Sequence, residues 1–208
     1  MDRKFVVILF VLIMNLGFVG ADGQGSISVT LDESSGDCVL GFSEGWNLFS
    51  FCSELEGNED LATLLSPLEG KYRYVMVWDK STQVFEIYSP RRNDAQPFYA
   101  FDDDKSYFIY MEEPTIFNVA GTESGSESRN LIEGWSSPSY PYRNSLFIED
   151  LISGFRDDLR YLMKWSSAKQ EFDVYSLERS GAQPFDIINM GEGQFIYLRS
   201  PNILVYNL

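Results

Sequence analysis

The chain has 208 residues, of which 31 are Asp or Glu, 16 are Lys or Arg and none is His, so its formal net charge is −15. A chain this acidic repels phosphate backbones, which excludes nucleic-acid binding through a basic face, and the absence of His excludes His-dependent triads and His-ligated zinc. The hydrophobic share of 44% is enough to build a packed core, so wholesale disorder is not expected.

Residues 1–21 have the pattern of a signal peptide. Arg3 and Lys4 form the positive start, an apolar run follows, and Val19-Gly20-Ala21 places small residues before a cleavage site. The alternative is a retained membrane anchor, but the apolar stretch 5–19 has 15 residues, fewer than the about 20 that a spanning helix needs. Cleavage removes one acidic and two basic residues and leaves a net charge of −16. We therefore expect an extracellular or cell-surface protein that contacts a membrane only if the leader is retained.

If the chain is exported, its two cysteines, Cys38 and Cys52, reach a compartment in which disulfides form. In an oxidising compartment, two cysteines separated by 13 residues most simply form one disulfide. Two buried free thiols are the alternative. A cysteine nucleophile needs a base, and the chain has no His to act as one.

The first part of the mature chain, residues 22–121, is expected to be β-rich with one short helix. Apolar and aromatic runs bounded by turn residues predict strands, and Asp60 is an N-cap candidate for a helix over residues 60–65. The predicted strands are at residues 26–31, 38–42, 46–51, 72–78, 84–88, 107–111 and 115–119. Pro114 is expected in a turn or on an edge.

A polar Gly/Ser linker over residues 122–130 leads into a second β-rich unit, residues 131–208, which repeats the first at an offset of 87. Between residues 58 and 121 the two copies share 20 of 64 positions. Recurring segments include Ala95-Gln96-Pro97-Phe98, which returns as Ala182-Gln183-Pro184-Phe185, and Phe108-Ile109-Tyr110, which returns as Phe195-Ile196-Tyr197. Residues 129–133 are expected to lead into this unit, and Ser145 is the N-cap candidate for its helix, residues 147–152. The fold class is mainly β (α+β), with two homologous units from an internal duplication.

The unit resembles the tandem Gly-Trp-Asn-Leu repeat module of archaeal and bacterial secreted surface proteins. Residues 45–50 match the first motif of that family, and residues 104–109 match its last motif loosely. The second copy keeps Gly134-Trp135 but departs from the pattern at residues 136–138, and it retains the final motif at residues 191–196. The resemblance implies an extracellular module without a known catalytic constellation, whose function lies in adhesion, in assembly or in accompanying domains.

Candidate sites are few. Asp102, Asp103 and Asp104 form the densest acidic cluster and are a calcium candidate, but their counterparts in the second copy are Asn189, Met190 and Gly191, which favours a solvated turn. We therefore expect no metal site and no cofactor. Nothing marks a pair of carboxylates for glycoside hydrolysis.

The four Trp residues recur in register, which favours the core over a sugar-binding platform. Tyr99 and Tyr142 have no aromatic match in the other copy and are the candidates for a surface contact, with Tyr140 a weaker one. The predicted function is a secreted or cell-surface, non-enzymatic binding or structural protein whose partner is a protein or a glycan. A carbohydrate-binding module, and a secreted hydrolase or inhibitor, are the alternatives.

Overall fold

The computed structural model describes residues 38–55, 60–122 and 127–206. The predicted signal peptide and the strand predicted at residues 26–31 lie outside these ranges. The described chain is mainly β, as predicted, with short helices on antiparallel sheets. Below, residues 38–122 are the first half and residues 127–206 the second half.

The first half is built on a four-stranded sheet. Its elements are β1 (Cys38–Phe42), β2 (Gly45–Phe49), α2 (Leu61–Leu64), η1 (Ser66–Leu68), β3 (Tyr72–Asp79), β4 (Val84–Tyr88), β5 (Tyr107–Met111) and β6 (Thr115–Val119). The sheet has the order β2–β5–β3–β4, and β1 pairs with β6 beside it. The strands predicted at residues 38–42, 84–88, 107–111 and 115–119 are confirmed with these bounds, and Pro114 lies in the turn between β5 and β6.

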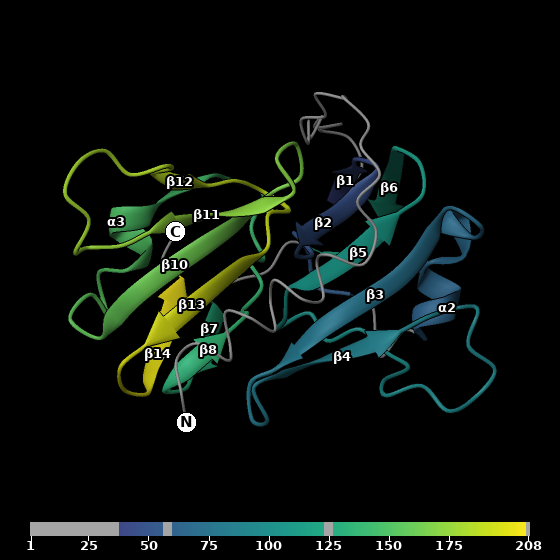
Figure 1. The fold of residues 1–208 in the computed structure, drawn as a ribbon, viewed down its shortest axis with the longest axis horizontal. Helices are drawn as coiled ribbons and strands as arrows, with labels where there is room; N and C mark the ends of the chain where they lie inside the picture. Colours follow the sequence, from purple (N-terminus) through teal and green to yellow (C-terminus); the bar gives the residue numbers. More distant parts are fainter. Residues whose placement is uncertain (1–37, 56–59, 123–126, 207–208) are drawn as a thin grey trace.

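The second half has the same arrangement. Its elements are β7 (Glu127–Leu131), β8 (Gly134–Ser136), β9 (Leu146–Phe147), α3 (Ile148–Leu151), β10 (Leu159–Ser166), β11 (Glu171–Tyr175), β12 (Ile187–Ile188), β13 (Gln194–Leu198) and β14 (Asn202–Tyr206). The sheet order β8–β13–β10–β11 matches that of the first half element for element. A common origin of the two halves stays a prediction from the sequence. Figure 1 shows α2 and α3 at opposite ends of the molecule, with the two sheets between them.

Two predicted boundaries need correction. β7 begins at Glu127, so the last four residues of the predicted linker form a strand, which pairs with β14. The N-cap of α3 is Phe147, without a side-chain cap, rather than Ser145. Because β9 pairs with β12, the chain after Ser145 stays extended, and the Ser145 hydroxyl donates to Asn189 Oδ1 at 3.0 Å instead. The cap predicted at Asp60 is confirmed, since its carboxylate accepts from Thr63 N at 3.1 Å.

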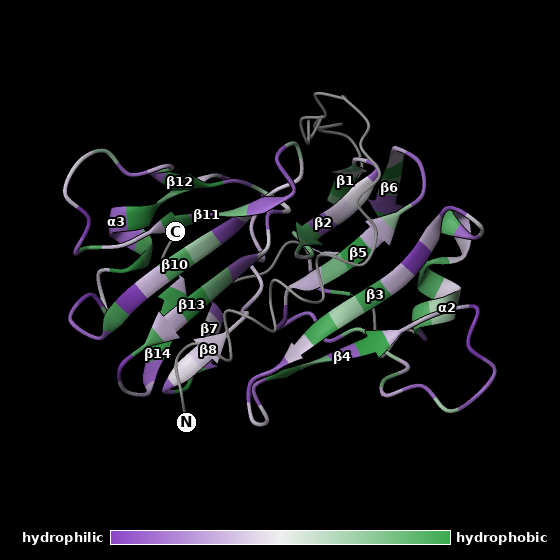
Figure 2. Cartoon of the chain, viewed as in Figure 1, coloured by the Kyte–Doolittle hydropathy of each residue, from purple (hydrophilic) through white to green (hydrophobic). Residues whose placement is uncertain are grey.

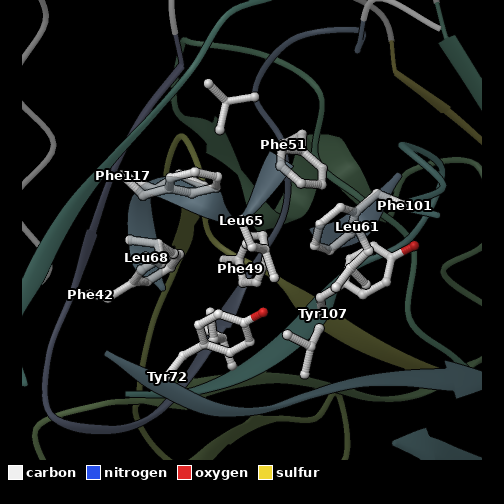
Figure 3. Packing of buried hydrophobic residues seen from close by; sticks show 14 of the residues in the cluster. Phe42, Phe49, Phe51, Leu61, Leu65, Leu68, Tyr72, Phe101, Tyr107 and Phe117 are labelled. Carbon is white, nitrogen blue, oxygen red and sulfur yellow. The ribbon is translucent and has the colours of Figure 1, made fainter. Parts of the chain in front are cut away.

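Each half has its own hydrophobic core on one face of its sheet. In the first half, α2, η1 and the β1–β6 pair pack Leu and Phe side chains against the sheet, and Phe49, Leu61 and Tyr107 meet near the centre (Figure 3). Hydrophobic residues gather along β5 and toward the C-terminal end of β3 (Figure 2). The core of the second half is built in the same way around Leu162 and Ile196.

A third cluster joins the two halves. It contains Trp46, Leu48, Met76, Trp78 and Phe108 from the first half and Trp165 and Phe195 from the second. The opposite faces of the two sheets therefore pack against each other over part of their area. The prediction that the Trp residues belong to the core is confirmed for Trp46, Trp78 and Trp165, and Trp135 packs partly buried against this cluster.

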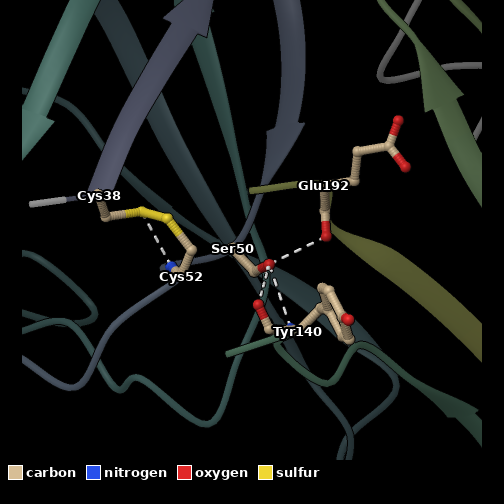
Figure 4. The surroundings of a disulfide bond; sticks show 5 residues. All are labelled: Cys38, Ser50, Cys52, Tyr140 and Glu192. Carbon is tan, nitrogen blue, oxygen red and sulfur yellow. Dashed lines mark hydrogen bonds between the residues drawn. A yellow bond between two sulfur atoms is a disulfide. The ribbon is translucent and has the colours of Figure 1, made fainter. Parts of the chain in front are cut away.

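Backbone hydrogen bonds cross between the halves in matching pairs. Ser50 N donates to Gly191 O at 3.0 Å and Gly193 N donates to Leu48 O at 3.3 Å, which extends β2 onto the loop before β13. The reciprocal bonds, Ser139 N to Asp104 O at 3.0 Å and Ser106 N to Ser137 O at 2.9 Å, extend β8 onto the loop before β5. Figure 4 shows Ser50 at this junction, where its hydroxyl donates to Glu192 O at 2.9 Å and accepts from Tyr140 N at 3.1 Å.

A glutamine clasp fastens the halves a second time, and it too is reciprocal. Gln170, in the β10–β11 turn, accepts from Trp46 N at 2.9 Å through Oε1 and donates to Trp46 O at 3.1 Å through Nε2. Gln83, in the β3–β4 turn, accepts from Trp135 N at 3.0 Å and donates to Trp135 O at 2.8 Å. Both glutamines have positive φ, 53° and 58°, a conformation uncommon for a residue with a side chain and held by surrounding contacts.

The clasp explains why Gly-Trp occurs in both halves. Gly45 and Gly134 have φ of +89° and +95°, which suits glycine. A Cβ added at Gly45 would lie 2.9 Å from Gln170 Oε1, and one added at Gly134 would lie 3.0 Å from Gln83 Oε1. Glycine is required here both for its backbone conformation and for the close approach of the glutamine.

Candidate binding surfaces

The part of each sheet face that the other half leaves uncovered carries a group of aromatic rings. In the first half, Tyr110 and Tyr74 lie on β5 and β3 beside Trp46 on β2, which is buried. Tyr74 is 37% exposed, and Ile87, on the neighbouring strand β4, is 37% exposed as well. We call Arg73, Tyr74 and Tyr110, together with the buried Trp46 beside them, the first aromatic surface.

The second half repeats this group with nearly the same geometry. Trp135 and Tyr161 are stacked with ring centroids 6.3 Å apart, as Trp46 and Tyr74 are at 6.4 Å. The middle ring is perpendicular to the tryptophan in both, with centroid distances of 5.0 Å for Trp135–Tyr197 and 5.1 Å for Trp46–Tyr110. We call Trp135, Arg160, Tyr161 and Tyr197 the second aromatic surface.

A β-bulge places an arginine on each surface. The register between β3 and β5 shifts between Tyr72 and Tyr74, so Arg73 is the extra residue. The register between β10 and β13 shifts in the same way around Arg160. A bulge re-aims the side chain of the extra residue. The guanidinium of Arg73 lies 5.7 Å from the centroid of the Tyr110 ring, and that of Arg160 lies 5.3 Å from the centroid of the Tyr161 ring.

The charges around the first aromatic surface form an ion-pair network. Glu112 Oε1 accepts from Arg73 Nε at 3.0 Å and Nη2 at 2.6 Å, while Glu112 Oε2 accepts from Arg91 Nη2 at 2.8 Å. The hydrogen bond from Arg73 is the main cause of the lowered pKa of Glu112. Two guanidinium groups therefore keep this carboxylate charged, and they are fixed by it in turn.

The residues predicted for a surface contact differ in how exposed they are in the structure. Tyr99 is 56% exposed, and its hydroxyl accepts from Gln96 N at 2.9 Å. Tyr142 is 2% exposed, and the surface position predicted for it is wrong. It is buried because its ring packs on Tyr140 and Tyr206, with centroids 5.9 and 5.7 Å away. Tyr140 is fully buried as well, so neither residue can offer a ring to a partner.

The aspartate triplet lies together as a cluster, with carboxylate oxygens within 4.8 Å of one another. Lys105 pairs with Asp102 at 2.9 Å, and Arg129 pairs with Asp104 at 3.0 Å. Partial burial is the main cause of the raised pKa of Asp104, and the charge of Arg129 opposes it. Two of the three carboxylates thus have a basic partner, and one of these partners, Arg129, also pairs with Glu127.

Cys38 and Cys52 form a disulfide, as predicted, with their Cα atoms 5.5 Å apart. Both are fully buried in the core of the first half. Cys52 N also donates to Cys38 Sγ (Figure 4). The bond closes the chain between β1 and the segment after β2, so its role is structural.

Several carboxyl groups have pKa values shifted in the direction opposite to that of a general acid, which needs a raised pKa. Hydrogen bonds from Thr82 and Ser81 lower the pKa of Asp79 to about 2. Hydrogen bonds also lower the pKa of Glu149, through Tyr175 and Arg156, and that of Asp158, through Ser200 and Asn202. These groups serve as caps and ion-pair partners in turns and at the surface.

Sequence reasoning missed both aromatic surfaces. The available signal was the dipeptide Arg73-Tyr74, which returns as Arg160-Tyr161 at the offset of 87. Recurrence alone favoured a core position, because a duplicated core also repeats its aromatics. The bulge that brings the arginine beside the rings depends on pairing with a strand more than 30 residues away and has no local signature.

No family model, curated protein or solved structure matches this chain. The resemblance to the Gly-Trp-Asn-Leu repeat module stays a prediction. Among the residues that the structure describes, no helix is long and apolar enough to cross a membrane.

Proposed function

We propose that the protein is a secreted or surface-associated, non-enzymatic protein that binds a partner or assembles outside the cell. Its first support is the sequence, which begins with the pattern of a signal peptide. Its second is the disulfide between Cys38 and Cys52, since disulfides persist in oxidising compartments.

The observation that carries the proposal is the occurrence of the same aromatic–arginine surface twice in one body. Partly exposed aromatic rings beside arginine are typical of binding surfaces. The reciprocal contacts of Gln83 and Gln170 hold the halves together, so the two surfaces keep a fixed spacing. A fixed pair of weak sites gains avidity on a repetitive surface without new contacts.

The test is binding of the labelled protein to the surface of the cells that produce it. We expect binding, and we expect the double variant Tyr74→Ser/Tyr161→Ser to lose at least about tenfold in affinity, the equivalent of about 1.4 kcal/mol. The affinity of each single variant should lie between those of the native protein and the double variant, because one of the two sites remains.

Phe147→Ser is the matched control, since Phe147 is an exposed aromatic residue that lies outside both surfaces. Circular dichroism checks that the variants are folded. The proposal is wrong if the native protein does not bind, or if the double variant binds as well as the control.

A further inference from the structure

The two aromatic surfaces differ in the place of one carboxylate. In the first half, Glu112 directly follows β5, and its Oε1 accepts two hydrogen bonds from the guanidinium of Arg73. Its backbone position is fixed by the hydrogen bond from Glu112 N to Lys71 O at 2.7 Å. The guanidinium of Arg73 thus has a partner from its own chain.

In the second half, the corresponding position is Arg199. Its backbone is fixed in the same way, by a hydrogen bond from Arg199 N to Asp158 O at 2.8 Å. Arg199 pairs with Glu178 at 2.5 Å, whereas the corresponding pair in the first half is Glu112 with Arg91 at 2.8 Å. The two charges of this pair are exchanged between the halves.

The exchange leaves Arg160 without the carboxylate that Arg73 has. Within the part of the chain that the structure describes, Arg160 forms no ion pair shorter than 4.0 Å. Its side-chain hydrogen bond is to Tyr161, and this bond is the main cause of its raised pKa. A neutral phenol does not compensate the charge of the guanidinium, so an incoming carboxylate gains a charge-assisted hydrogen bond.

Arg160 is held in a position that suits recognition. The bulge places its guanidinium over the Tyr161 ring, and Tyr161 is itself stacked on Trp135. A guanidinium fixed on an aromatic face loses little side-chain freedom when it forms a fork of hydrogen bonds to a carboxylate.

The pairing of the neighbouring charges leaves Arg160 available to an anion. Glu178 pairs with Arg199 at 2.5 Å, and Asp158 interacts with Arg199 as well, so both nearby carboxylates are engaged by a different arginine. Beside these groups, the partly exposed rings of Tyr161 and Tyr197 provide apolar contact for the C–H face of a sugar ring. A ligand that combines a carboxylate with such a ring matches both features.

We propose that the second aromatic surface is a binding site for a carboxylate-bearing saccharide of the uronic acid type. The carboxylate takes, against Arg160, the place that Glu112 has against Arg73, and the sugar ring lies beside Tyr161 and Tyr197. The first aromatic surface has the same rings, but Glu112 occupies its carboxylate position. This inference rests on the proposed binding function and names the ligand class of one of its two surfaces.

The experiment is a calorimetric titration of the purified protein with a uronic acid oligosaccharide and with the neutral oligosaccharide of the same linkage. We expect one acidic saccharide to bind per chain. The neutral saccharide should bind at least about tenfold more weakly, since a hydrogen bond to a charged group contributes more than the 1.4 kcal/mol that corresponds to tenfold.

Two variants that move the carboxylate give the decisive arms. The double variant Arg199→Glu/Glu178→Arg reproduces the arrangement of the first half with an unchanged net charge, and it should reduce binding of the acidic saccharide at least about tenfold. Conversely, Glu112→Gln frees Arg73, and we expect the stoichiometry to rise from one to two. Melting temperatures confirm that both variants are folded.

The inference is overturned if acidic and neutral saccharides bind equally, if the charge-exchanged variant binds like the native protein, or if poly-glutamate binds more tightly than the saccharide. If no saccharide binds, but whole cells are still bound through Tyr74 and Tyr161, the saccharide assignment fails while the proposed binding function stands.

Discussion

Replacing Gly45 by alanine tests the glutamine clasp between the two halves. Gly45 has a φ of +89°, and forcing an L-residue into the left-handed region costs about 1–2 kcal/mol. The new Cβ would also lie 2.9 Å from Gln170 Oε1, so Gln170 has to move and both of its hydrogen bonds to Trp46 are lost. At about 0.5–1.5 kcal/mol net for each bond, this adds about 1–3 kcal/mol.

Gly70→Ala provides the control, because Gly70 has a φ of +78° and no atom within 4 Å of an added Cβ. It should cost the conformational part alone, about 1–2 kcal/mol. Urea denaturation of both variants gives the free energies of unfolding, and we expect Gly45→Ala to be less stable than Gly70→Ala by about 1–3 kcal/mol. Equal losses in the two variants would refute the clasp as a stabilising contact.

Three further predictions concern stability. Reduction of the disulfide, or Cys52→Ser with Cys38→Ser, should lower the free energy of unfolding by about 3 kcal/mol, the value for a closed loop of this size, and urea denaturation with and without reductant measures the loss. Burial raises the pKa of Tyr140 from 10.0 to about 12, so its contribution to folding stability is complete below pH 10 and is lost as the pH rises to about 12. Between pH 10 and 12, the thermal midpoint of Tyr140→Phe should therefore fall less than that of the native protein. Parallel plots of thermal midpoint against pH for the two proteins would contradict this. The pKa of Asp79 is lowered from 3.8 to about 2, so its contribution to folding stability is complete above pH 4 and disappears toward pH 2. Asp79→Asn should therefore be less stable than the native protein at pH 5 and about equally stable at pH 2. A difference in the free energy of unfolding that stays constant with pH would count against this assignment.

Most of the strands could be predicted from the sequence because the residues that favour a strand lie within the strand itself and in the turns beside it. Residues 84–88, 107–111 and 115–119 combine β-branched and aromatic side chains between turn residues, and the structure confirms them. The cap at Asp60 needed only the residues that follow it. The wrong cap at Ser145 shows the limit of local signals. The residues after Ser145 form β9 because they pair with β12, which lies about 40 residues further along the chain, and this pairing delays the start of the helix.

The arrangement of the two halves could not be predicted in this way. Gln170 and Trp46 are 124 residues apart, and nothing near either residue indicates the other. Tyr142 was expected at the surface because it has no aromatic match, but an unmatched residue can also fill a gap in one core, as Tyr142 does beside Tyr206. The aromatic surfaces depend on the same long-range packing, which leaves the end of each sheet face uncovered.

The measurement that tests the proposed function most directly is the location and N-terminal sequence of the native protein. Fractionation of the producing cells should recover it outside the cell or on the cell surface, with a chain that begins near Asp22 after removal of the leader. Recovery in the cytosol with residues 1–21 intact would contradict export, and with it the proposal that the protein binds partners outside the cell.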